Sequence, residues 1–216
     1  MFLAQLHLIN FKNYEDVEVD QPYIFQVYEK GKPLDKIGQR SADTSELFFE
    51  DVRVPVSNRL GEEGRGFIYL MSQLPQERLQ IGTTAIAVIE RALALTIDYV
   101  KERKAFGKPI GAFQMTQAKI ADMKCKLDAA TLLTLRAAWV KGQGQRFSNE
   151  AAIAKLTASE AAMWITHQAL QIHGGMGYSK EMPLERYFRD AKITEIYEGT
   201  SEIQRLVIAR NETGLR

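Results

Sequence analysis

Cysteine is nearly absent from the sequence: of 216 residues, only Cys125 is a cysteine. A single cysteine excludes an internal disulfide and leaves no thiolate cluster for a metal. A reducing compartment is therefore expected, and we predict a cytoplasmic protein. Histidine is also scarce. His7, His167 and His173 do not have the spacing of metal ligands, so no metal site is expected.

The sequence has almost no excess of charge of either sign. Twenty-eight basic and 27 acidic residues give a net charge of +1, which implies no strong attraction to nucleic acid or an anionic membrane. No basic region opens the chain, and no apolar run approaches the ~20 residues that span a bilayer. We therefore expect neither a signal peptide nor a membrane-spanning helix.

The sequence also lacks a phosphate-binding loop. Residues 1–21 read as two short strands around a polar turn at Lys12–Asn13, and they resemble the opening of RecF-type DNA repair ATPases. In that family a loop of backbone amides and a lysine holds the nucleotide, but no G-x-x-x-x-G-K-[ST] motif occurs in this chain. We expect a hairpin without its ATPase. A RecF-like clamp fragment is the nucleic-acid alternative, which the near-neutral charge also disfavours.

Residues 22–58 favour β-structure. Strand-like runs lie at Tyr23–Tyr28, Leu47–Phe49 and Val52–Val54. A flexible link follows at Gly61–Gly66, whose glycine spacing is wrong for a dinucleotide-binding motif. The sequence therefore predicts a short β-rich segment ahead of the rest of the chain.

Over residues 59–216, apolar residues recur at the period of an α-helix. Three apolar stripes are expected, and they cover Ile81–Tyr99, Ile120–Ala130 and Leu156–Leu170. Asn149 is the expected cap of the third helix, and Gly174–Gly175 its expected stop. Three such stripes cannot all face water. The predicted fold class is therefore mainly α, an antiparallel helical bundle completed by a shorter helix after Thr200.

The stretch before that last helix places Glu198 between an aromatic ring, Tyr197, and a glycine, Gly199. Ser201 and Gln204 have the spacing of a capping box, and Thr200 is an alternative cap, so a helix should begin near Ser201. Apolar neighbours make a carboxylate there more basic, whereas the helix N-terminus makes it less basic. Glu198 is then either a base suited to neutral pH or an ordinary polar turn residue.

Three motifs in this chain resemble those of the acyl-CoA dehydrogenases. They are Tyr-Glu-Gly-Thr at 197–200 with Glu-Ile-Gln-Arg at 202–205, Arg-Lys-Ala-Phe-Gly-Lys-Pro-Ile at 103–110 with Phe-Gln at 113–114, and Gln-Ile-His-Gly-Gly-Met-Gly-Tyr at 171–178. The resemblance covers Asp35 to the C-terminus, and residues 22–58 resemble the end of the family's middle β domain. It implies FAD-dependent desaturation of acyl-CoA thioesters between the α and β carbons.

The resemblance also implies which residues meet the substrate. Glu198 is the expected base that removes the α proton. Glu77 is a rival, because the isovaleryl and long-chain members carry their glutamate on this earlier helix. The expected substrate-binding residues are Glu77, Arg78, Tyr197, Gly199 and Arg210, the last at the CoA end. Glu77 and Arg78 could equally be charged neighbours on a solvated helix face.

By the same resemblance, several residues are expected to bind FAD. They are Arg103, Phe106 and Gln114, for the FAD of an adjacent subunit; Gln171, Ile172, His173, Gly174 and Gly175, for its adenosine end; and Thr200 and Glu202, for the flavin. Without the family match, Arg103 would merely favour a helix C-terminus and the glycine pair would be a helix stop.

A homodimer or homotetramer is expected, because the Arg103 and Gln171–Gly175 elements would face a neighbour's cofactor. Electron-transferring flavoprotein is a candidate partner. The family's N-terminal helical domain and most of its β domain have no counterpart in this chain, which would leave a flavin open to water. Two alternatives therefore stay open, a desaturating enzyme and a non-catalytic helical bundle that serves subunit association.

Overall fold

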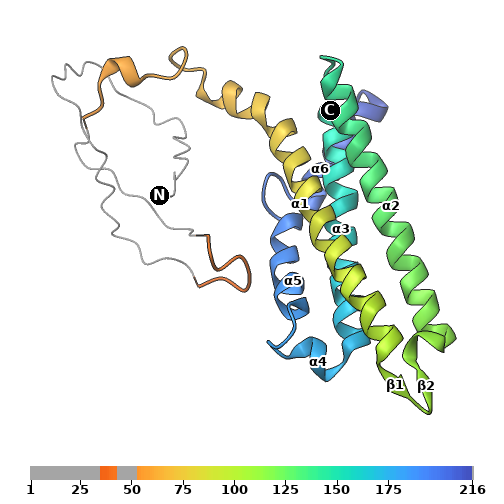
Figure 1. Cartoon of the computed structure of the whole chain (residues 1–216). Coiled ribbons are helices and arrows are strands. Elements are labelled where there is room, and N and C mark those ends of the chain that lie inside the picture. The colour runs from red at the N-terminus through yellow and green to blue at the C-terminus, as the bar shows by residue number, and fades with distance from the viewer. Residues whose placement is uncertain (1–34, 43–52, 216) are drawn as a thin grey trace. The chain divides into compact units, whose positions relative to one another are not determined.

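The computed structural model describes residues 35–42 and 53–215, drawn in colour in Figure 1. The chain divides into two compact units. One of them contains Ile37–Gln39 and the chain from Leu74 onward, and it holds the helical bundle. The contacts of the candidate site all lie within this unit.

Most of the segment predicted to be β-rich lies outside the described residues, as does the hairpin expected at 1–21. Arg53 and Val54 are described and lie in no strand, so the strand expected there is not formed by these two residues. They lead directly into Pro55 and a 3₁₀ turn, η1 (Val56–Asn58), and proline cannot donate a ladder hydrogen bond. The domain boundaries after residues 21 and 58 stay predictions.

Helices make up most of the described chain. They are α1 (Gly66–Glu102), α2 (Gln114–Gly142), α3 (Ser148–His173), α4 (Gly175–Tyr178), α5 (Leu184–Ala191) and α6 (Ser201–Thr213). Successive long helices run antiparallel, and α3 packs against α2, α5 and α6 (Figure 1). The predicted mainly α, antiparallel bundle is confirmed.

The core of the bundle is built from the apolar faces of α1, α2 and α3. On α1, Ala85 and Ala92 of the predicted stripe are buried, but Val88 is only partly buried and the adjacent Ile89 is fully buried. The buried face is thus rotated slightly from the predicted line. On α2, the predicted Met123 and Leu127 are both buried.

Small side chains dominate the buried face of α3. All seven of its alanines are buried, at positions 151, 152, 154, 158, 161, 162 and 169. Alanines let neighbouring helices approach closely, so α3 can be enclosed by several helices. The helix begins at Ser148 with Phe147 as its N-cap, so the cap expected at Asn149 is wrong. Asn149 lies in the first turn instead, and its amide donates to Glu212. The helix ends at His173, and Gly174, with φ +57°, is its C-cap, so the stop predicted at Gly174–Gly175 is confirmed.

Two features of the bundle were not foreseen. A tight hairpin, β1 (Lys104–Ala105) and β2 (Lys108–Pro109), joins α1 to α2 through the 3₁₀ turn η2 (Ile110–Ala112). Its turn residues Phe106 and Gly107 have φ of +50° and +79°. The other feature is α5, which packs on α3. In Figure 1 the hairpin lies at one end of the bundle and α6 at the other.

Helix α1 is long and apolar enough to cross a membrane, by length and composition alone. One window of 18 residues has a mean hydropathy of 1.3, and 39% of that window is buried inside the structure. The charged pair Glu90 and Arg91 interrupts the apolar residues of this helix. Its core residues, such as Ile89 and Leu93, pack against α2 and α3. That packing is typical of a core helix.

Candidate functional site

The Glu198–Gly199 turn connects a 3₁₀ turn, η3 (Lys192–Glu195), to the start of α6. Glu198 has φ +54° and Gly199 has φ +94°, so both lie in the left-handed region. Such a conformation is uncommon for a residue with a side chain, and it persists only where surrounding contacts hold it. The turn therefore needs partners beyond its own backbone.

Three side chains supply those partners by donating to two successive carbonyl oxygens. Arg78 Nε donates to Glu198 O at 3.2 Å, and Lys155 Nζ donates to Gly199 O at 2.8 Å. Gln204 Nε2 donates to both oxygens, at 3.2 and 2.8 Å. The donors come from α1, α3 and α6, and their exposed fractions are 7%, 0% and 0%. Three helices thus fix one turn.

Two of the three donors are buried cations. Burial and, after it, the nearby charge of Arg78 lower the pKa of Lys155 to about 8, although the carboxylates of Glu195, Glu198 and Glu202 oppose the change. Burial also lowers the pKa of Arg78, while the charges of Glu198 and Glu77 raise it. The carboxylates of the site therefore lie near two positively charged side chains, Arg78 and Lys155.

Both candidate bases lie close to the same guanidinium. Glu77 precedes Arg78 on α1 and is half-buried, and Glu198 approaches Arg78 from the turn; each interacts with it electrostatically. The interpretation of Arg78 as part of a solvated helix face is wrong, because its side chain is buried against the turn. The roles of Glu198 and Glu77 as base and rival stay predictions.

Tyr197 is half-buried beside Glu198. Burial raises the pKa of its hydroxyl, a hydrogen bond with Gln39 lowers it, and the Glu198 charge raises it. Gln39 itself has φ +46°, and its backbone N–H donates to the Asp190 carboxylate on α5. A segment far upstream in the sequence thus contacts the residue next to the candidate base.

The last helix begins at Ser201, as predicted, and Thr200 is its N-cap, with Oγ1 accepting from Ile203 N at 3.4 Å. The capping box of Ser201 and Gln204 does not form, because the Gln204 side chain is turned to the Glu198 and Gly199 carbonyls. A cavity of about 340 Å³ opens beside this helix start. It is lined by Glu160, Lys192, Glu195, Ile196, Thr200, Ser201, Glu202 and Arg205.

A second cavity, of about 330 Å³, lies beside the β1–β2 hairpin. Its lining includes Phe106, Gln171 and Ile172, three of the residues predicted to bind the cofactor. The Phe106 ring is 96% exposed at the tip of the hairpin and meets the Phe113 ring edge-on, with centroids 6.2 Å apart. Arg103 and Gln114 are also exposed. These residues form a surface rather than an enclosed pocket.

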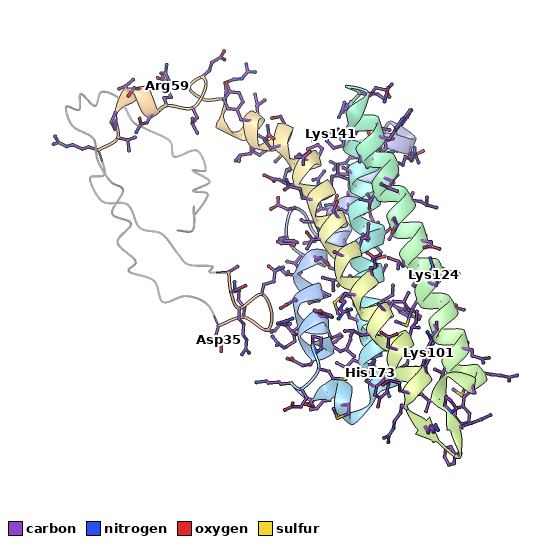
Figure 2. The ribbon with its side chains drawn as sticks, viewed as in Figure 1. Asp35, Arg59, Lys101, Lys124, Lys141 and His173 are labelled. Atoms are coloured by element: carbon purple, nitrogen blue, oxygen red, sulfur yellow. The ribbon has the colours of Figure 1, made fainter. Side chains whose placement is uncertain are left out.

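His173 lies at this same end of the bundle, where Figure 2 labels it. Its ring stacks on Tyr99 of α1 with centroids 4.1 Å apart, and Nδ1 is 2.8 Å from Ala169 O. Burial lowers the pKa of His173, and it is only 2% exposed. The imidazole thus packs inside the bundle, whereas Gly174 and Gly175 are exposed. Its assignment as a cofactor contact stays a prediction, whereas its packing against Tyr99 is seen in the structure.

The two cavities are separated along α3. Glu160 lines the first and Gln171 the second, and 11 helical residues correspond to about 16 Å. Thr200 and Glu202 line one cavity, and Phe106 and Gln171 line the other. Within one subunit, the two pairs therefore cannot contact the same part of a small ligand. Arg210 lies in the last turn of α6, about 15 Å along that helix from the Glu198 turn.

Lys155 is the site residue that the sequence did not single out. A signal for it exists: one helical turn to either side, its neighbours are Ala151 and Ser159, within a helix of buried alanines. A lone lysine on a face of small residues has room to run its stem inside the protein, because its neighbours leave space. The segment around Gln39 carries no comparable signal.

The helical part of the chain matches one family model. Residues 64–213 match the model described as the acyl-CoA dehydrogenase C-terminal domain. The mitochondrial short-chain specific acyl-CoA dehydrogenase of Bos taurus is 54% identical over 179 residues, which are 83% of this chain and 43% of that protein. The chain thus spans less than half the length of that relative.

Solved structures give the same result. The butyryl-CoA dehydrogenase of Megasphaera elsdenii is similar with a TM-score of 0.81 and 47% identity, over 84% of this chain and 48% of that one. A chain from a study of the electron transferring flavoprotein of Acidaminococcus fermentans and flavin-based electron bifurcation has a TM-score of 0.84 and 43% identity, over 88% and 50%.

Proposed function

The chain belongs to the acyl-CoA dehydrogenase family, and we propose that its reaction is the FAD-dependent α,β-desaturation of an acyl-CoA thioester, with Glu198 as the base. The observation that carries this proposal is the turn itself. Three buried donors hold the backbone carbonyls of Glu198 and Gly199 and keep Glu198 in a left-handed conformation. Contacts from three helices therefore hold the backbone from which the Glu198 side chain extends.

Desaturation needs one proton acceptor in the protein. Glu198 takes the proton from the α carbon, the α,β double bond forms, and the β hydrogen leaves with its electron pair. Bound FAD would supply the acceptor for that hydride. The buried cations Arg78 and Lys155 favour the ionised carboxylate, which is the form that can accept a proton.

The residues present fit one wall of a cofactor site. Ser201 Oγ is buried, lines the cavity at the start of α6 and has no hydrogen-bond partner in the described parts of the chain. An orphaned hydroxyl at a helix N-terminus is suited to a ligand with acceptor oxygens. At the other end, the exposed Phe106 ring and Gln171 offer a surface for a second subunit's cofactor.

We also propose a short acyl chain, because the relatives that match are named for short-chain and butyryl substrates. A cytoplasmic homodimer or homotetramer completes the proposal, with electron-transferring flavoprotein as the candidate acceptor of electrons. Weak FAD retention is expected from the isolated chain, since it provides one wall only.

A non-catalytic bundle for subunit association is the second candidate, and one observation favours it. Leu132, Leu135 and Trp139 recur on the outer face of α2 at the spacing of a helical stripe, and they are 67%, 59% and 64% exposed. Such a patch is suited to a partner helix. The same patch would serve the oligomer of an active enzyme.

The test is flavin reduction by substrate. Purified protein, supplemented with FAD and mixed anaerobically with butyryl-CoA, should lose the flavin absorbance, and Glu198→Gln should not. Light scattering should show a dimer or tetramer. Absorbance that is unchanged by substrate, in an oligomeric protein that binds FAD, would favour the non-catalytic bundle.

A further inference from the structure

Lys155 is the largest side chain that is fully buried in the described chain. Burying an ammonium group is costly unless it is paired, so a lysine inside an alanine-rich helix needs a reason. Packing is not that reason, because an apolar residue would fill the same space without the desolvation cost. The reason should therefore lie in what its ammonium touches.

That ammonium touches the turn of the candidate base. It donates a hydrogen bond to Gly199 O at 2.8 Å. The charged groups that face it are Arg78 from α1, Glu195 from η3, Glu198 from the turn and Glu202 from α6. Arg78 repels it, so the carboxylates and the carbonyl oxygen must hold the charge in place.

Holding the carbonyls of residues 198 and 199 fixes the two peptide planes on either side of the Gly199 α carbon. Glycine at φ +94° would otherwise be the most adaptable position of the turn. The Glu198 α carbon lies in the first of these planes, so the point from which its side chain extends is held in place. Base catalysis depends on such geometry, because a misplacement of about 1 Å can cost about 100-fold in rate.

Building on the proposed desaturation, we propose that Lys155 is a positioning residue for Glu198. Its ammonium holds the Gly199 carbonyl, and its positive charge favours the ionised form of the nearby Glu198 carboxylate. Gln204 shares the first task and not the second, since an amide carries no charge. The two residues can therefore be told apart by experiment.

The experiment measures α-proton exchange of butyryl-CoA in deuterated water across a range of pH, with FAD added to the full chain. Lys155→Met should lower the maximal exchange rate about 10- to 100-fold and move the acid limb of the profile to higher pH. Gln204→Met should lower the rate without moving that limb. Ser159→Ala, one helical turn from Lys155, should change neither.

Two outcomes contradict the proposal. One is a Lys155→Met profile that equals that of the unmodified chain. The other is a lowered rate in Lys155→Met with the acid limb in place, as in Gln204→Met, which would leave Lys155 only a structural role. If Lys155→Met does not fold, Lys155→Gln keeps an N–H donor, loses the charge, and should still move the acid limb.

A second measurement does not depend on activity. The carbonyl ¹³C resonance of Gly199 should shift with a midpoint near pH 8, where Lys155 loses its proton, and should not do so in Lys155→Met. If the unmodified chain exchanges no α protons, the proposed desaturation fails while this resonance still decides the role of Lys155. A Gly199 carbonyl ¹³C resonance that does not shift around pH 8 would overturn the inference.

Discussion

The two ends of the bundle hold residues of one expected site in opposite ways. Around the Glu198–Gly199 turn, the chain supplies its own buried partners from α1, α3 and α6. At the β1–β2 hairpin, Phe106 is 96% exposed and the cavity beside it is open to an incoming surface. The first end is organised by this chain alone, whereas the second has the form of half a site.

This contrast predicts where substitutions will be felt. Changes near the turn should alter stability and its pH dependence, because the partners there are buried and charged. Changes near the hairpin should leave stability alone and alter association with a cofactor or a second subunit.

The largest effect is expected from the charge of Lys155. Its pKa is lowered from 10.5 to about 8, so between these values the unfolded chain binds a proton that the folded chain has lost. The free energy of unfolding should therefore rise with pH over that window, by up to about 3 kcal/mol. Urea unfolding at pH 7.5 and 10 should show this rise in the unmodified chain and not in Lys155→Met.

The control for that experiment is Lys124→Met. Lys124 is an exposed partner of Asp128 on α2, and its removal should leave the rise with pH intact. A Lys155→Met chain that gains as much stability as the unmodified chain between the two pH values would show that Lys155 is not the titrating group. At neutral pH the variant should be about as stable as the unmodified chain, since an apolar residue avoids the desolvation cost.

The next effect concerns the backbone of the turn. Gly199→Ala adds a methyl group to a residue with φ +94° and places it 2.7 Å from Gln204 Nε2. We expect a loss of about 2 kcal/mol in the free energy of unfolding. Gly144→Ala is the matched control, because Gly144 has φ +70° and nothing within 4 Å of the added carbon. A loss equal to that of Gly144→Ala would mean that Gln204 moves freely, and that the turn is less constrained than its contacts indicate.

A smaller effect should follow at His173. His173→Leu removes the stack on Tyr99 and should cost about 1 kcal/mol at pH 7.5. Because burial lowers the pKa of His173, the unfolded chain takes up a proton before the folded one as the pH falls through 6.5. The unmodified chain should therefore lose stability below that pH, and His173→Leu should lose less. Parallel acid unfolding curves for the two proteins would contradict this.

The smallest effect on stability is expected at the hairpin. Phe106→Ala should change the free energy of unfolding by less than about 0.5 kcal/mol, since the ring is almost wholly exposed. It should nevertheless reduce FAD retention or subunit association, measured by equilibrium dialysis and light scattering. Tyr178→Ala, at a residue 81% exposed outside both cavities, should reduce neither. If the two variants retain FAD and associate equally well, the hairpin is not part of the site.

The fold was predictable because periodicity reports burial directly. The stripe on α2 contains Met123 and Leu127, which are buried as expected, and the stop at Gly174 follows from its left-handed conformation. The hairpin between α1 and α2 was not predicted, because two-residue strands leave no alternating pattern. Asn149 was misjudged as a cap because helix starts are uncertain by a residue or two from sequence.

The sequence pointed to the turn of the candidate site but not to the residues that support it. The motif at residues 197–200 pointed to the turn, but the charges behind it come from Arg78 and Lys155, which lie far away in sequence. Gln204 was assigned to a local capping box, whereas tertiary contacts direct it to the Glu198 and Gly199 carbonyls. Sequence spacing describes neighbours on one helix and is silent about which helices meet.

The most direct measurement of the central claim is α-proton exchange of butyryl-CoA in deuterated water, with FAD added, in three proteins side by side. We expect exchange in the unmodified chain, a loss of at least ~100-fold in Glu198→Gln, and little change in Glu77→Gln. The amide of Glu198→Gln keeps the shape of the turn and cannot take the proton. Exchange that survives in Glu198→Gln and disappears in Glu77→Gln would assign the base to α1 and contradict the catalytic role of the Glu198 turn.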